Sequence, residues 1–393
     1  MTDQCPHCGN NPVSHRLTWA SASVSVLALP IHSRTGRWLD RLGGYIAKYA
    51  FMTVVYIFRM CGLARTSTDP AGAMSDRGKV LWEEALRRGY KFNGYTVLGK
   101  NTDAYRAQLK GRTLYFSAIL RPVTTESGAD WWLDDKALLK DKLKHAGIPT
   151  PRGGSFSRFE PLRTCFEMLE KPVIVKPRIG SRGRHATTHI TTEEELYDAF
   201  LCAKQLCHWV VLEEHLVGSV YRGTLIDGKL VGVLRGDPPR IVGDGERTIV
   251  ELVAIKNSLR HSKVAPVELT DTHERFLLRT GRNFDTVPPL GQVVDLLEKI
   301  GVSYGGYSAE EIDITHLETR RVLEAAGRAI ADPIIGFDFI IADITRNPHE
   351  QKWGIIECNS APFINLHHDP VGGTPINVAA HVWDYTEKYL DRF

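Results

Sequence analysis

The sequence predicts a mixed fold of the α+β or α/β class, because helical and strand-like segments follow one another along most of its 393 residues. Short runs rich in Val and Ile, such as Val173–Pro177 and Val210–Leu216, have the composition of buried strands. The segment Lys136–Ala146 has a helical composition and is followed by Gly147. A hydrophobic content of 43% and a charged content of 24% are ordinary for a globular protein, and the length suffices for two or three domains.

The N-terminal region, residues 1–74, has a role that the sequence leaves open. Cys5 and Cys8 have the spacing of a zinc knuckle, but a structural Zn²⁺ site takes four ligands. Zn²⁺ at this pair is therefore a minor hypothesis, whose remaining ligands would come from His7, His15 or Cys61.

Two apolar segments follow the cysteines. Residues 19–31 alternate small polar and apolar side chains, which favours a strand. Residues 45–64 are strongly apolar but are interrupted by Lys48 and Arg59, so they do not make a membrane span. We expect a helix that packs in the core or at a subunit interface. Because residues 1–65 carry seven Lys and Arg against two Asp, contact with an anionic membrane surface is the minority interpretation.

Residues 75–132 are expected to form a small α/β domain. Val80–Arg88 has the pattern of a helix that Gly89 closes, and Tyr95–Leu98 and Thr113–Leu120 have the composition of strands. The remaining residues, 133–393, are expected to form one larger domain.

A glycine-containing loop follows the strand that carries Lys176. Gly180 and Gly183 allow the backbone to approach a ligand closely, and exposed N–H groups in such a turn form an anion cradle. Arg182 and Arg184 add fork-shaped donors that match phosphate oxygens. Lys176, at the end of an apolar strand, needs an anionic partner, and a nucleotide phosphate would serve. The loop therefore predicts a phosphate site, although such a loop alone is more often a plain turn.

Three polar side chains lie in apolar strand-like runs near the C-terminal end. The period of two along a strand places Glu357 and Asn359 on one face, and Asp338 on the preceding strand would join them. Two carboxylates and an amide oxygen are hard ligands that suit Mg²⁺, which takes its other ligands from nucleotide phosphates and water. Cys358 points to the opposite face and is expected in the core. The competing interpretation is a satisfied polar network without metal.

These motifs resemble, in their order along the chain, those of the ATP-grasp superfamily. Two further stretches make the resemblance narrower, to the ATP-grasp portion of cyanophycin synthetases and related amino-acid ligases: 242–245 leading into 248–257, and 287–289 leading to 305–306. The resemblance covers about two thirds of the chain, and six motifs in the family's order are far more specific than any one of them.

The resemblance implies an ATP-grasp fold, in which two α+β subdomains grip ATP, preceded here by the small α/β domain. It also implies an ATP-dependent carboxylate–amine ligase that forms an acyl phosphate and then an amide or peptide bond, with release of ADP and phosphate. Its cofactors would be ATP and one or two Mg²⁺, and its substrates an amino acid or peptide and an amine. A homo-oligomer is expected from the family.

The resemblance also implies roles for individual residues. Phosphate contacts fall to Lys136, Lys176 and Arg184, with Gly180 and Gly183 in the loop above them. The nucleoside would be held near Glu213 and Glu214, and Mg²⁺ by Asp338, Glu357 and Asn359. Stabilisation of the acyl phosphate or of the tetrahedral intermediate would fall to Arg222 and Arg235.

The chain departs from the family pattern at two points. Val220 stands where the family has an acidic ribose contact, so Glu214 is a candidate for that role. No Gly-x-x-x-x-Gly-Lys-Ser/Thr motif occurs, so we expect one ligation rather than the two of cyanophycin synthetases. His367 and His368 are candidates for substrate contact, and equally for a structural role.

Three alternative functions stay open. One is an ATP-grasp phosphotransferase that stops after a kinase-like step. Another is a non-catalytic ATP-binding module whose basic N-terminal residues recruit it to a membrane or partner. The third is a binding module for which Cys5 and Cys8 form a zinc anchor.

Composition and the first residues bear on the compartment. Seven cysteines, an odd number without a regular framework, indicate reduced thiols, and the polar start is unlike a secretory signal. We therefore expect a cytoplasmic protein. A net charge of +3 predicts no nucleic-acid partner.

Overall fold

The small N-terminal domain is a four-stranded antiparallel sheet with one helix across it. The computed structural model describes residues 5, 7–8, 12–27, 53–122, 130–180 and 183–393. The strands are adjacent in the order β1 (Ala64–Ser67), β2 (Lys91–Val97), β3 (Lys100–Leu109) and β4 (Arg112–Ser117). The sheet thus begins N-terminal to the boundary expected at residue 75.

The predicted helix of this domain is confirmed as α3, Asp76–Arg87. It begins at Ser75, whose hydroxyl accepts a hydrogen bond from the Gly78 amide. The two predicted strands overlap β2 and β4 but extend past their C-terminal ends. We did not predict β3, because polar residues such as Asn101 and Asp103 interrupt its apolar pattern.

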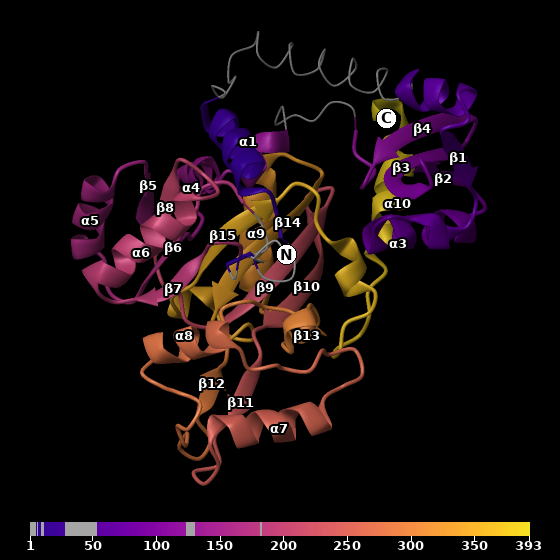
Figure 1. Ribbon diagram of the computed structural model, residues 1–393. Coiled ribbons are helices and arrows are strands. Elements are labelled where there is room, and N and C mark those ends of the chain that lie inside the picture. Colours follow the sequence, from indigo (N-terminus) through magenta and orange to yellow (C-terminus); the bar gives the residue numbers. More distant parts are fainter. Residues whose placement is uncertain (1–4, 6, 9–11, 28–52, 123–129, 181–182) are drawn as a thin grey trace.

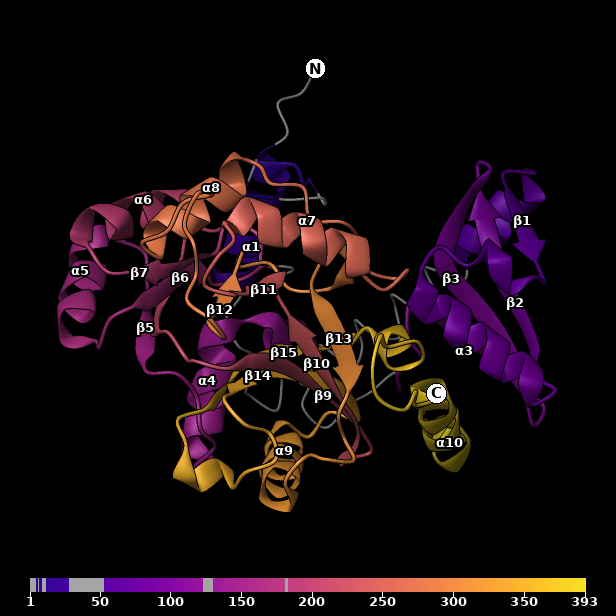
Figure 2. The same ribbon diagram turned by 90° about the horizontal axis from the view of Figure 1, so that it is seen from below.

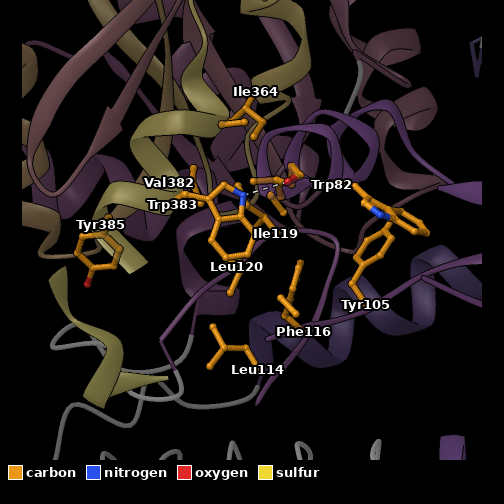
Figure 3. Packing of buried hydrophobic residues seen from close by; sticks show 14 of the residues in the cluster. Trp82, Tyr105, Leu114, Phe116, Ile119, Leu120, Ile364, Val382, Trp383 and Tyr385 are labelled. Carbon is orange, nitrogen blue, oxygen red and sulfur yellow. Dashed lines mark hydrogen bonds between the residues drawn. The ribbon is translucent and has the colours of Figure 1, made fainter. Parts of the chain in front are cut away.

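The C-terminal helix α10 (Val378–Lys388) packs on the small domain although it follows in sequence the whole of the larger one. Figures 1 and 2 place it beside α3, and Figure 3 shows the core that they share. Trp383 is fully buried there and donates a hydrogen bond from Nε1 to the Leu81 carbonyl at 3.0 Å. Burial of each such side chain contributes about 1.5–3 kcal/mol. The small domain and the C-terminal helix α10, which are far apart in sequence, therefore share one apolar core.

The first half of the larger domain is a second antiparallel sheet, in the order β5-β8-β6-β7, with helices on one face (Figure 1). Val173, Val175, Val210 and Leu212 point from the two central strands into its core. The elements are β5 (Gly153–Phe156), α5 (Phe159–Met168), β6 (Val173–Pro177), β7 (Thr187–Ile190), α6 (Glu193–Lys204) and β8 (Val210–Glu214).

The second half is a five-stranded antiparallel sheet in the order β13-β10-β9-β14-β15. Its apolar face packs against α4 (Lys136–His145) and α9 (Leu317–Ile330), which leaves the other face for polar residues. The strands are β9 (Ser219–Ile226), β10 (Lys229–Asp237), β13 (Tyr307–Glu310), β14 (Ile334–Ile341) and β15 (Gly354–Asn359).

A smaller cluster, inserted in the chain between β10 and β13, lies at the lower edge of Figure 1. It comprises a two-stranded antiparallel ribbon and two helices with a core of their own. These elements are β11 (Arg240–Val242), α7 (Ile249–Leu259), α8 (Asp271–Arg279) and β12 (Val293–Asp295).

The strand predicted over residues 19–31 is wrong where the structure describes it, because His15–Leu27 form the helix α1. Ser21 and Ser25 donate their hydroxyl protons to the carbonyls of Thr18 and Ser21, at 3.0 and 2.9 Å. These bonds satisfy serine within a helix, so the alternation of serine with apolar residues did not require a strand.

The apolar segment 45–64, which was predicted to be a helix, lies partly outside the described residues. Within its described part, residues 53–60 are helical. Among the residues that the structure describes, no helix is long and apolar enough to cross a membrane.

Candidate functional site

The three predicted metal ligands converge on one face of the five-stranded sheet. Asp338 of β14 and Glu357 of β15 stand opposite each other in the register of the two strands. The Asn359 amide lies 3.4 Å from Asp338 Oδ2. Neighbouring strands thus place two carboxylates and an amide together, which is the donor set expected for a hard cation.

Arg222 of β9 completes this group on the same face. It pairs in register with Asp338, and its guanidinium donates from Nε and Nη2 to the two carboxylate oxygens, each at 2.7 Å. Burial lowers the pKa of Arg222, but the Asp338 carboxylate outweighs this effect and raises it. The bidentate pair therefore keeps a charged guanidinium beside the predicted metal ligands.

Lys136 links the metal ligands to the glycine-containing loop. It is the first residue of α4, directly after Asp135, whose carboxylate caps the helix by accepting from two backbone amides. Its buried ammonium donates to the Gly180 carbonyl at 2.8 Å and lies 3.5 Å from Glu357 Oε2. A cation at this position is shared between the two motifs that the sequence predicts to bind phosphate and metal.

Lys176 meets a buried carboxylate rather than open solvent. Its ammonium lies 3.1 Å from Glu213 Oε2, and Lys140 also contacts that side chain. Burial alone would raise the pKa of Glu213, but Lys140 and Lys176 hold it at about 2. Burial lowers the pKa of Lys140 to about 8, although Glu213 opposes the shift. Two ammonium groups against one carboxylate leave an excess of positive charge at the end of β6, which leads into the glycine-containing loop.

Lys140 was missed in the sequence. It lies four residues after Lys136 on α4, and side chains at this spacing share one face of a helix. The four-residue spacing could have pointed to Lys140, because it places a second lysine on the same helix face as the predicted phosphate contact Lys136.

The loop itself contains the two expected glycines with unusual backbone angles. Gly180 has φ of 157° and Gly183 has φ of 62°, and the latter favours glycine over any residue with a side chain. Arg184 follows in the same loop. Arg182 lies outside the described residues.

Glu214 and Arg235 are placed away from this group. Glu214 follows Glu213 and so points to the other face of β8, where it accepts from the Arg152 amide at 2.9 Å and lies 2.9 Å from Lys352 Nζ. Arg235 pairs with Tyr221 in register, and therefore lies on the face opposite Arg222. Arg235 instead contacts Asp237 at 2.8 Å.

His367 and His368 both take part in hydrogen-bond networks, with His367 buried and His368 half-buried. His367 lies 2.7 Å from Thr224 Oγ1 and 2.6 Å from Glu310 Oε2, and it is fully buried. His368 accepts from the Ala379 amide at 3.2 Å, and burial lowers its pKa to about 4. Of the two interpretations left open for these residues, the contacts support the structural one.

The small domain also contacts the site, through arginines that the sequence did not single out. Arg121 donates to the carbonyls of Ile334 and Ser360, the first at 3.0 Å, and pairs with Asp332. Arg77 donates to the Ala361 carbonyl at 2.5 Å. These bonds position the turn that directly follows Asn359.

The chain is similar to known proteins over part of its length. No family model matches the chain. The chain is 32% identical over 257 residues to the cyanophycin synthetase of Trichormus variabilis, and the alignment covers 64% of the chain and 28% of that protein. It is 26% identical over 313 residues to a glutathione biosynthesis bifunctional protein of Clostridium perfringens, and this alignment covers 75% of the chain and 39% of that protein.

The solved structures give the same fold. The crystal structure of a bifunctional glutathione synthetase from Pasteurella multocida superimposes with a TM-score of 0.53 at 23% identity, over 79% of this chain and 43% of that one. The chain thus spans less than half the length of these relatives. These similarities show that the chain has an ATP-grasp fold and is related to the cyanophycin synthetases over about two thirds of its length.

Proposed function

We propose that this protein is an ATP-dependent carboxylate–amine ligase that joins an amino acid or peptide to an amine. The observation that carries the proposal is the position of Lys136, which contacts the glycine-containing loop at Gly180 and lies 3.5 Å from Glu357. One cation thereby connects the predicted phosphate site to the predicted metal site. Such a cation would help to neutralise the charge on a transferring γ-phosphoryl group.

The residues present fit Mg²⁺. Asp338, Glu357 and Asn359 supply oxygen ligands on one sheet face and would hold the ion. When bound, Mg²⁺ neutralises negative charge on the nucleotide phosphates. Arg222 already compensates part of the charge of Asp338, so this carboxylate is oriented before the ion arrives.

The residues around the loop fit a nucleotide triphosphate. Lys136, Lys176 and Arg184 are the proposed phosphate contacts, and Gly180 and Gly183 shape the loop above them. Glu213 keeps Lys176 oriented. Lys140 contributes a second ammonium group, so the three side chains together carry a net positive charge for the phosphates. The proposed contact of Glu213 with the adenine stays a prediction, as does a role of Glu214 near the ribose.

The proposed reaction has two steps. A carboxylate oxygen of the substrate attacks the γ-phosphorus of ATP, and the bond to the bridging oxygen breaks to release ADP. The amine then attacks the carbonyl carbon of the acyl phosphate, loses a proton and expels inorganic phosphate. Arg222, on the face of the proposed metal ligands, is our candidate for stabilising the developing negative charge. Arg235 on the opposite face is a weaker candidate for that role.

The test is release of ADP and phosphate by the protein with Mg²⁺-ATP and pools of amino acids and dipeptides, followed by mass spectrometry. Pool-dependent release with a product lighter by one water than its parts supports the ligase. A phosphorylated product without hydroxylamine-trappable acyl phosphate points to the phosphotransferase instead. ATP binding without turnover on any pool points to the non-catalytic module. The expected homo-oligomer stays a prediction, which light scattering of the same sample tests.

A further inference from the structure

Four thiol and imidazole groups from distant parts of the chain meet beside the glycine-containing loop. We propose that Cys5, Cys8, His15 and His185 bind one Zn²⁺, and that the ion fastens the N-terminal segment to the end of this loop. Their ligand atoms all lie within 4.8 Å of one another. Neither the ligase chemistry nor the magnesium site uses any of these side chains.

The distances match the edges of a tetrahedral zinc site. Cys8 Sγ lies 3.3 Å from His15 Nε2, and the sulfurs of Cys5 and Cys8 each lie 3.5 Å from His185 Nε2. Bond lengths of about 2.3 Å to sulfur and about 2.0–2.1 Å to nitrogen give a sulfur-to-nitrogen edge of about 3.5 Å in a tetrahedron. The four groups are therefore already spaced for an ion among them.

The surroundings of His185 also suit a metal ligand. Its Nδ1 lies 2.8 Å from the Cys202 carbonyl, which leaves Nε2 directed at the two sulfurs. Such a bond from the second ring nitrogen to a carbonyl orients most histidine ligands of metals in proteins. Cys8 and His185 are buried, as in a closed structural site. Two thiolates and two imidazoles in tetrahedral spacing favour zinc over Mg²⁺ or Ca²⁺.

The backbone supports the same connection between distant segments. The His185 amide donates to the His7 carbonyl at 3.2 Å, and Lys299 Nζ donates to the same oxygen at 3.2 Å. The helix that carries His15, α1, also contacts the segment that leads into β8, because Ser23 accepts a hydrogen bond from the His208 amide at 3.2 Å. The knuckle is thus held against the nucleotide-binding half by contacts beside the proposed ion.

The ion would restrict the loop at a defined point. His185 follows Gly183 by two residues and itself has a left-handed backbone, with φ of 53°. Fixing this end of the loop removes conformations that ATP would otherwise have to exclude on binding. This consequence rests on the proposed nucleotide site, whereas the assignment of the ion does not.

The first experiment measures metal in the full-length protein purified from zinc-supplemented cells. We expect one Zn²⁺ per chain, and loss of nearly all of it in Cys5→Ser, Cys8→Ser and His185→Ala. His7→Ala and Cys165→Ser are the matched controls, because they alter the knuckle and the thiol count without removing a proposed ligand. Substitution with Co²⁺ should give the visible absorption of a tetrahedral thiolate site in the wild type and both controls.

Two results would overturn the assignment. One is a wild-type protein without stoichiometric zinc or a tetrahedral Co²⁺ spectrum. The other is equal zinc content in Cys5→Ser and His7→Ala. Because Cys5 is only half-buried and lies near the start of the chain, Cys5→Ser should fold, and circular dichroism checks this.

The second experiment separates the ion from the ligase proposal. Calorimetry of ATP binding, without any acceptor substrate, compares the wild type with Cys5→Ser and with chelated wild type. We expect the dissociation constant for ATP to rise about two- to tenfold when zinc is lost, and not to change in His7→Ala. An unchanged dissociation constant with zinc confirmed in the protein would refute the fastening of the loop but leave the metal site standing. Absence of ATP binding in every sample would count against the proposed function, while the zinc content would still decide the metal site.

Discussion

Arg222 and Asp338 form a bidentate ion pair across adjacent strands, with both hydrogen bonds at 2.7 Å. The pair lies on the sheet face that also carries Glu357 and Asn359. The guanidinium therefore neutralises part of the carboxylate charge on the sheet face that we propose to bind Mg²⁺. This relationship makes the site sensitive to any change that separates the two partners.

Replacement of Arg222 by Ala should make stability depend on Mg²⁺. Removal of one partner of a largely buried pair leaves an uncompensated charge on Asp338 and should lower the free energy of unfolding by about 3–5 kcal/mol. Millimolar Mg²⁺ should restore part of this loss, because the ion would replace the missing cation. Urea unfolding with and without Mg²⁺ measures the effect. Arg235→Ala, on the other face, is the control, and equal stabilisation of both variants by Mg²⁺ would contradict the metal assignment.

Glu357→Gln should abolish most ATP-dependent turnover while the protein stays folded. Loss of one anionic metal ligand and of the partner of Lys136 should reduce kcat for ADP release by about 10²–10³-fold. A coupled assay for ADP measures this at saturating Mg²⁺-ATP. Glu350→Gln, an exposed glutamate just before β15, should keep wild-type activity. Full activity in Glu357→Gln would show that the site is misassigned.

Lys176→Ala should weaken nucleotide binding. The change removes one of the two ammonium groups beside Glu213, so the excess of positive charge near the loop disappears. We expect the KM for ATP to rise at least about tenfold, in line with the loss of one charge-assisted contact to phosphate. Lys204→Ala is a suitable control. This lysine ends α6 and donates to the carbonyls of Ser157 and His208, so it has no proposed phosphate contact. An unchanged KM in Lys176→Ala would be incompatible with its proposed phosphate contact.

The ion pairs of Glu213 should appear in the pH dependence of stability. Because the folded-state pKa of Glu213 is lowered to about 2, its ionised form stabilises the fold above the unfolded-state pKa of about 4.3. That contribution should be lost as the pH falls from about 4.3 towards 2. Glu213→Gln should be less stable than the wild type at pH 7, and the difference should shrink over this window. A difference independent of pH, measured by urea unfolding from pH 7 to pH 2.5, would speak against the pairing.

Trp383→Ala should uncouple the C-terminal helix from the small domain. Its indole is fully buried against α3 and bonded to the Leu81 carbonyl, so truncation leaves a large cavity and an unpaired acceptor. The free energy of unfolding should fall by about 3–5 kcal/mol. Trp19→Ala, at a 42% exposed position on α1, should change it by less than about 0.5 kcal/mol. Equal stability of the two variants in chemical denaturation would exclude the shared core.

Local pattern was enough to locate the ligands of the proposed magnesium site. The period of two along a strand already put Glu357 and Asn359 on one face, and the register of β14 with β15 is consistent with Asp338 beside them. The strand of Lys176 and the helix that begins at Lys136 were likewise readable from apolar composition, because both depend on neighbours within a few residues.

Other features depended on contacts between residues far apart in sequence. Cys8 and His185 are 177 positions apart, so the sequence offered His15 among the possible partners of the two cysteines but gave no sign of His185. The Glu213 pair with Lys140, the face of Arg235 and the packing of α10 on the small domain were decided in the same way, by strand register and by burial. The alternation of serine with apolar residues in α1 misled the prediction of secondary structure. A serine hydroxyl can donate to a backbone carbonyl of the preceding helical turn, so this pattern is compatible with a helix as well as with a strand. Periodicity specifies an element and its faces, whereas only the packed structure determines which faces meet.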